Sequence, residues 1–161
     1  MKHRLQPASL LPISAGEAPI PHRSHCPIAY ALDTFGDRWT LLIIRDLIFK
    51  RKRRYGEFAE AEEGIATNIL ADRLARLRNE GIVRVVADPS DSRGKLYSLT
   101  EKGLDLAPLL IEMILWSASH DSASAAEPGF ISRARNARQT LLAEIRAANL
   151  RPVGEGVAQA V

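Results

Sequence analysis

Residues 64–100 read GIATNILADRLARLRNEGIVRVVADPSDSRGKLYSLT, and this stretch decides the fold. Leucines recur at helical spacing and Gly81 supplies a stop, so a helix is predicted over about 67–80. The β-branched segment 82–87 and the segment 95–99 predict two strands, joined by the polar turn 88–94. The stretch therefore predicts a helix followed by a β-hairpin with a long tip.

Three helices are expected before this stretch. The cysteine–proline pair at 26–27 has the form of an N-cap and a first helical position, and the helix that it begins ends near Gly36. Asp37 is expected to cap a second helix, because its carboxylate can accept from first-turn N–H groups. The basic run 50–54, which we expect to be solvated, precedes a short helix near 57–62. This order predicts a mainly α fold with a small β-hairpin wing, a winged helix-turn-helix.

The chain after the hairpin carries more apolar surface than one small core needs. A helix starting at Thr100 has two apolar stripes, and the surplus stripe marks an interface with a second copy of the chain. We therefore expect a homodimer that associates through terminal helices. The candidate interface residues are Ile28, Leu106, Leu110, Met113 and Trp116.

The 161 residues divide into five expected segments. They are a flexible, proline-rich arm at 1–24, the winged helix-turn-helix and dimerisation domain at 25–120, a linker at 121–129, a C-terminal helix at 130–149 and a flexible tail at 150–161. The C-terminal helix could brace the dimer, add basic surface or cover the preceding helix, and we favour the brace. No run of about 18 apolar residues occurs, so we expect a cytoplasmic protein without a membrane partner.

Three sets of residues occur in the order and spacing of a known family. They are Cys26, Pro27, Ala31, Leu32, Gly36, Asp37, Arg38, Trp39 and Leu42; then Arg54, Tyr55, Glu57, Phe58, Gly64, Ile65, Leu70, Arg73, Leu74, Leu77, Gly81 and Ile82; then Tyr97, Leu99, Thr100, Gly103, Leu104 and Trp116. Over roughly residues 25–118 the chain resembles the HxlR family. The resemblance implies a winged-helix transcriptional regulator that binds operator DNA. Ala66 departs from the family's capping serine, and Thr67 is expected to take over the cap.

The helix at 67–80 is the element that such a fold places in the DNA major groove. Its outward residues Thr67, Asn68, Asp72 and Arg76 are the candidates for reading bases, since Asn can bond adenine and Arg can bond guanine. Without its context the same pattern would indicate only a solvated helix face.

Phosphate contacts are expected from cations of the basic run 50–54, here called the corner, from the wing and from the start of the second helix. The candidates are Arg38, Lys50, Arg51, Lys52, Arg53, Arg54, Arg93 and Lys95. The formal net charge is only +3, so the position of the cations matters more than their number. An alternative interpretation of the basic run is a surface without function.

Cys26 is the only cysteine, so any disulfide must join two molecules. A thiol at a helix N-terminus is stabilised as thiolate, which fits a sensor of oxidants or electrophiles; the alternative is a small buried hydrophobe. The resemblance to the HxlR family favours the sensor, because some members of that family respond to oxidants or electrophiles through such a cysteine. His22, His25 and Cys26 lack a fourth ligand at suitable spacing, so no metal site is predicted.

Catalytic motifs are missing from the sequence. It contains no Walker loop, GxSxG elbow, HExxH or dinucleotide fingerprint, so we expect neither an enzyme nor a cofactor. The predicted function is a homodimeric, sequence-specific DNA-binding regulator on a pseudo-palindromic operator, with double-stranded DNA as partner and an effector not specified by the sequence. The alternative is a winged-helix protein-interaction module, which would not need cations on both corner and wing.

Overall fold

The computed structural model describes residues 25–150. The expected arm at 1–24 and residues 151–161 of the expected tail lie outside this range. The elements are α1 (Pro27–Phe35), α2 (Arg38–Ile48), α3 (Tyr55–Ala59), α4 (Thr67–Asn79), β1 (Val83–Ala87), β2 (Lys95–Leu99), α5 (Glu101–Leu104), α6 (Ala107–His120), α7 (Pro128–Asn136) and α8 (Arg138–Leu150). The order confirms the expected mainly α fold with a β-hairpin wing.

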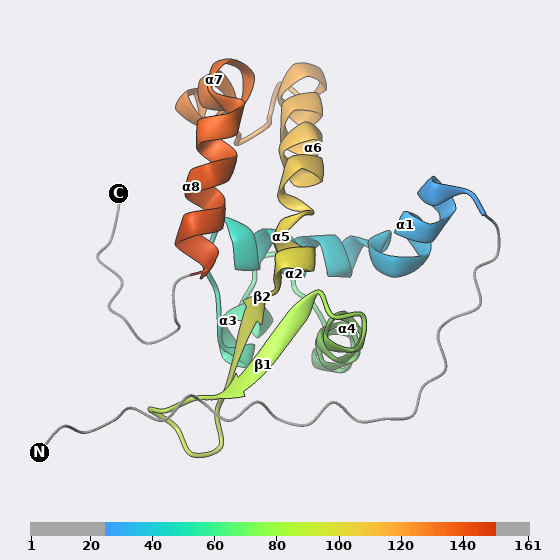
Figure 1. Cartoon of the computed structure of the whole chain (residues 1–161), viewed down its shortest axis with the longest axis vertical. Helices are drawn as coiled ribbons and strands as arrows, with labels where there is room; N and C mark the ends of the chain where they lie inside the picture. Colours follow the sequence, from blue (N-terminus) through green and yellow to red (C-terminus); the bar gives the residue numbers. More distant parts are fainter. Residues whose placement is uncertain (1–24, 151–161) are drawn as a thin grey trace, which may run out of the picture.

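Helix α2 lies at the centre of the molecule (Figure 1). Helix α4 and the hairpin lie on one side of it, α6, α7 and α8 rise on the other, and α1 projects from its N-terminal end. Asp37 caps α2 as predicted, because its Oδ1 accepts from the backbone N–H groups of Trp39 and Thr40, each at 3.1 Å. Cys26 and Pro27 take the predicted N-cap and first positions of α1, without a side-chain cap bond.

The main core forms where α2, α4 and the hairpin meet. Ile44 and Leu47 of α2 are completely buried, and Leu70 and Leu77 of α4 pack in the same cluster. Strands β1 and β2 pair antiparallel with Val83 opposite Leu99 and Ala87 opposite Lys95, so Leu99 reaches this core. Burial of one leucine side chain contributes about 1.5–3 kcal/mol, so the leucine stripe of α4 fixes that helix firmly on α2.

Two expected helices are each divided in the structure. The helix expected from Thr100 is interrupted after Leu104, since Pro108 lacks the N–H that would bond the carbonyl of Leu104. The C-terminal helix expected over 130–149 is a pair, α7 and α8, broken at Ala137. Ala134 of α7 and Leu141 of α8 are buried in one cluster with Ile111 of α6, so both members of the pair pack on α6.

Candidate nucleic-acid interface

Helix α4 has one face that is open to solvent. Its exposed side chains recur at helical spacing on the side opposite the buried leucines. They are Thr67, Asn68, Ala71, Asp72, Ala75 and Asn79. Thr67, Asn68 and Asp72 are thus placed on this face as expected, while the alanines Ala71 and Ala75 add a low, smooth surface on which another molecule could approach the helix closely.

The N-terminus of α4 has no side-chain cap. Ala66 occupies the N-cap position and Thr67 is the first helical residue, so the expectation that Thr67 provides the cap was wrong. The reason is positional, because a capping side chain must come from the residue before the helix. The first-turn N–H groups of α4 therefore gain no side-chain acceptor from the N-cap residue.

Ala66→Ser is expected to raise the free energy of unfolding by about 0.5–2 kcal/mol, because the serine hydroxyl can accept from a first-turn N–H. Urea denaturation monitored by circular dichroism measures the change. Ala71→Ser is the matched control, since it adds the same hydroxyl in the middle of the exposed face and should be neutral or slightly destabilising. Equal effects of the two variants would contradict the capping explanation.

Two arginines of α4 point back toward the body. Nε of Arg73 donates to Oδ1 of Asp37 at 2.9 Å, so the cap of α2 is also an anchor for α4. Partial burial acts to raise the pKa of Asp37, but hydrogen bonds from Thr40 and Arg73 outweigh it and the pKa lies below its usual value. These contacts fix the angle at which α4 presents its exposed face.

Arg76 does not belong to the exposed face. Its guanidinium donates to the backbone carbonyl oxygen of Asp33 in α1, and the side chain is only partly exposed. The structure thus corrects the expected position of Arg76 on the exposed face, while base reading by Arg76 stays a prediction. The physical reason is the reach of the side chain, which extends from the edge of the helix to an unsatisfied carbonyl near the end of α1. Arg76 instead ties α1 to α4.

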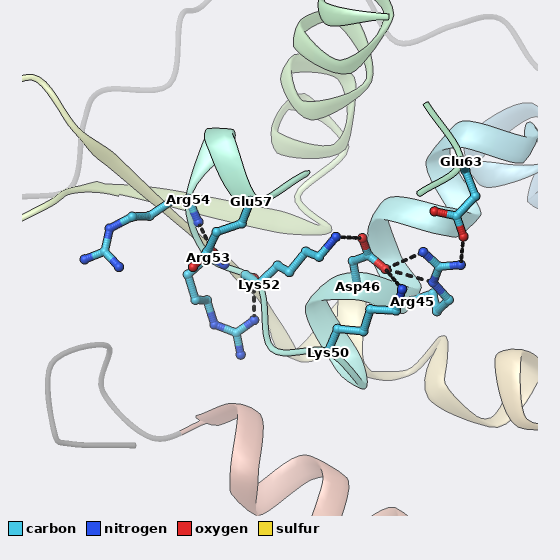
Figure 2. Close-up of polar contacts among 8 residues, drawn as sticks. All are labelled: Arg45, Asp46, Lys50, Lys52, Arg53, Arg54, Glu57 and Glu63. Carbon is cyan, nitrogen blue, oxygen red and sulfur yellow. Dashed lines mark hydrogen bonds and ion pairs between the residues drawn. The ribbon is translucent and has the colours of Figure 1, made fainter. Parts of the chain in front are cut away.

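Lys50 and Lys52 of the basic run 50–54 are directed toward Asp46 (Figure 2). The carboxylate of Asp46 is 4% exposed and pairs with Nη2 of Arg45 at 2.6 Å, Nζ of Lys52 at 2.8 Å and Nζ of Lys50 at 3.9 Å. Arg45 also pairs with Glu63, and that hydrogen bond is the main reason why the pKa of Glu63 falls to about 2. Part of the run is therefore an internal ion-pair network and not a solvated patch.

Lys52 and Arg53 are withdrawn from the surface. The side chain of Lys52 is 18% exposed, and Arg53 donates to the carbonyl oxygens of Leu47 and Lys52 and to Oδ1 of Asn149, each at 2.9 Å. Burial lowers the pKa of Arg53 to about 10, so it stays protonated at neutral pH. Both residues are poorly placed for phosphate contacts, which corrects the expectation from sequence; Lys50, Arg51 and Arg54 remain exposed.

The wing presents its cations at the tip. Arg93 and Lys95 are exposed there, as is Arg38 at the start of α2, where its guanidinium lies over the Trp39 ring at 5.0 Å. Arg54 holds the base of the tip through a 2.7 Å ion pair to Asp88. Hydrogen bonds from Ser90 and Arg54 lower the pKa of Asp88 to about 2, so the carboxylate keeps this turn closed across the neutral range.

Sequence reasoning missed one cation of the wing. Arg84 of β1 is exposed and its Nε donates to Oγ of Ser98 at 2.8 Å on the paired strand. Alternation along β1 could have identified it, since Val83 and Val85 point inward on either side of it. Arg84 pairs with Ser98 near the base of the hairpin, and by strand alternation its side chain is on the opposite face of the sheet from Lys95, which pairs with Ala87.

A separate exposed apolar surface, here called the α1–α6 surface, lies on those two helices. Its large side chains are Ile28 (69% exposed), Tyr30 (43%), Leu32 (61%), Leu109 (40%), Met113 (44%) and Trp116 (67%). Leu110 is only 6% exposed and belongs to the main core, and Leu106 packs against that core. These two residues are therefore not part of the exposed surface on which the sequence placed them. Leu109, Met113 and Trp116 are exposed at helical spacing and share one face of α6.

Cys26 is exposed at the N-cap of α1, so the alternative in which it is a buried hydrophobe is wrong. Among residues 25–150 no group of three His, Cys, Asp or Glu side chains could hold a metal ion. In the same range no helix is both long and apolar enough to cross a membrane.

A model of the HxlR-like helix-turn-helix family matches residues 34–125. The chain belongs to the HxlR family. It is 36% identical over 88 residues to sll1512, an uncharacterised HTH-type transcriptional regulator of Synechocystis, which covers 55% of the chain and 64% of that relative. To YvaP of Bacillus subtilis, another uncharacterised HTH-type transcriptional regulator, it is 34% identical over 93 residues, with 57% of the chain and 85% of the relative covered. The chain thus spans less than two thirds of the Synechocystis relative.

Two solved structures are similar to this chain in sequence and fold. PA1607, described as a candidate transcription factor, is 39% identical with a TM-score of 0.58 and covers 65% of this chain and 72% of its own. The redox regulator HypR in its oxidised form is 29% identical to this chain, with a TM-score of 0.54. The match covers 61% of this chain and 100% of HypR. Residues 34–125 therefore form an HxlR-like helix-turn-helix domain, similar to a domain of these relatives. Helices α7 and α8 lie beyond the matched residues 34–125.

Proposed function

We propose that this HxlR regulator binds a specific pseudo-palindromic operator as a homodimer, with α4 in the major groove and the wing on the phosphate backbone. The observation that carries the proposal is the exposed α4 face, which is rigidly anchored by Arg73 and flanked by the exposed wing cations Arg93 and Lys95. Asn68 and Asp72 supply donors and acceptors for base edges, while the wing cations supply sequence-independent affinity.

The α1–α6 surface supports the homodimer. A monomer with Leu32, Met113 and Trp116 this exposed leaves an apolar stripe in water, and a second copy offers the same stripe for burial. In a two-fold dimer the two α4 helices would enter successive major grooves about 34 Å apart. Sedimentation of the purified protein and footprinting on its operator test the two parts of this arrangement; a single unpaired half-site would contradict it.

The first test is binding to DNA from upstream of the protein's own gene and its neighbours, in competition with random DNA. Specific binding that weakens with salt supports the proposal. Binding without preference over the competitor, or no binding, would favour the protein-interaction module.

Asn68→Ala is expected to weaken operator binding by about 1–3 kcal/mol and to relax selectivity at one base pair. Arg93→Ala should instead weaken binding to every sequence. It should also reduce the slope of log affinity against log salt concentration by about one, the value for one lost phosphate contact. Fluorescence anisotropy with the operator and with single-base variants, over a series of salt concentrations, separates the two effects. If Asn68→Ala lowers affinity equally on all sequences, the residue contacts the backbone and not a base.

A redox response is the second part of the proposed function. Cys26 is exposed at a helix N-terminus, and the structural neighbours include the redox regulator HypR in oxidised and reduced forms. Oxidation would join the thiols of two copies, which give up two protons and two electrons to the added oxidant. Loss or gain of operator binding on diamide treatment, absent in Cys26→Ser, is the expected result; an identical response in the variant would exclude the thiol.

A further inference from the structure

We propose that Asn149 of α8 is a positioning residue that fixes the wing on the helix-turn-helix through Arg53. The inference rests on the proposed function for its effect on DNA binding, whereas the mechanical link stands on the fold alone. The carboxamide of Asn149 is 3% exposed and its hydrogen-bonding groups are directed at two parts of the chain. Oδ1 accepts from Nη2 of Arg53 at 2.9 Å, and Nδ2 donates to the carbonyl oxygens of Ile48 at 3.2 Å and Ile145 at 2.9 Å.

Arg53 passes this contact on to the wing. Its backbone carbonyl accepts from the N–H of Tyr97 at 2.8 Å, and the next residue, Arg54, forms an antiparallel bridge with Leu96. Arg53 and Arg54 thus pair with β2 on the edge that β1 does not use. Asn149 of α8 therefore positions Arg53, and Arg53 in turn bonds the outer edge of the hairpin at Tyr97.

The side chain of Arg53 depends on Asn149 for part of its hydrogen bonding. Among residues 25–150, its guanidinium has three acceptors, the carbonyl oxygens of Leu47 and Lys52 and the amide oxygen of Asn149. Because these are neutral oxygens in a mostly buried place, losing one leaves a buried cation short of an acceptor. The guanidinium would then move toward water and release the segment beside β2.

A second tie joins α8 to the same segment. Arg51 has a φ of 54°, a conformation that residues other than glycine seldom adopt, and its guanidinium donates to the carbonyl oxygen of Ala148. The last turn of α8 therefore contacts the corner at Arg51 and at Arg53. Because α8 lies beyond residues 34–125, the wing of the matched domain is supported by a helix that the family model does not cover.

Hydrogen exchange in the free protein tests the link without DNA. In Asn149→Ala the amide of Tyr97 is expected to exchange about tenfold faster, while the amides of Ile44 and Leu47 in α2 keep the wild-type rates. Gln139→Ala, an exposed substitution on the same helix, should leave every rate unchanged. Unchanged exchange at Tyr97 overturns the proposal, and so does equal acceleration in α2 and β2, which would assign Asn149 to global stability.

A double-mutant cycle tests the consequence for binding. Asn149→Ala should lower DNA affinity about fivefold on operator and random DNA alike, and should have little further effect when Arg93 and Lys95 are already alanine. Equal losses in both backgrounds would show that Asn149 does not act through the wing, which overturns the positioning role. If the wild-type protein binds no DNA, the proposed function fails, and the exchange rates still decide the link between α8 and β2.

Discussion

Asp46→Ala is expected to lower the free energy of unfolding by about 3–5 kcal/mol, the range for breaking a buried ion pair from one side. The carboxylate is 4% exposed and lies among Arg45, Lys50 and Lys52. Its removal leaves three cations near one another with no common counter-charge, and Lys52, 18% exposed, cannot be fully solvated without moving the corner. Urea denaturation, followed by circular dichroism at neutral pH, measures the loss.

Asp105→Ala is the matched control for this variant. Asp105 also pairs with an arginine, Arg146 at 2.7 Å, but its side chain is 69% exposed. Exposed ion pairs contribute about 0–1 kcal/mol, so the control should change stability little. If Asp46→Ala costs less than 1 kcal/mol, the network in Figure 2 is only a surface arrangement, and the basic run could reorganise to meet DNA.

The hydrophobic pattern predicted the helices and strands well, because burial of an apolar stripe leaves a period in the sequence. Leu70, Leu74 and Leu77 identified α4, and the β-branched run identified β1. The break between α5 and α6 was visible as Pro108 but was outweighed by the continuous apolar pattern around it. The pair α7 and α8 was less predictable, since the apolar period continues unbroken through the turn at Ala137.

Charged residues were predicted less well than apolar ones, because a long side chain can leave the face on which its backbone lies. The position of Arg76 on the helix suggested solvent, yet its guanidinium reaches α1. Asp46 and Lys50 are four residues apart, which is a recognised spacing for a helical ion pair and could have indicated the network. The contact of Arg53 with Asn149 had no local signal, since 96 residues separate the partners.

Met113→Asp is expected to produce a folded monomer that has lost most of its affinity for the operator. Met113 is 44% exposed between Leu109 and Trp116 on α6, so the carboxylate is solvated in the monomer but would be buried without a partner in a dimer. A dimer that contacts two half-sites binds about 10²–10⁴ times more tightly than a monomer that contacts one, and the variant loses this factor. Analytical ultracentrifugation gives the mass, and anisotropy on full and half operators gives the affinity.

Thr140→Asp provides the control, because it introduces the same charge at an exposed position of α8, outside the α1–α6 surface. It should remain dimeric and bind the operator like the wild type. Affinity for a half operator should be similar in Met113→Asp and the wild type, since the α4 face is untouched. A Met113→Asp protein that is still dimeric would place the interface elsewhere, and a monomer with wild-type affinity for the full operator would remove the need for a dimer altogether.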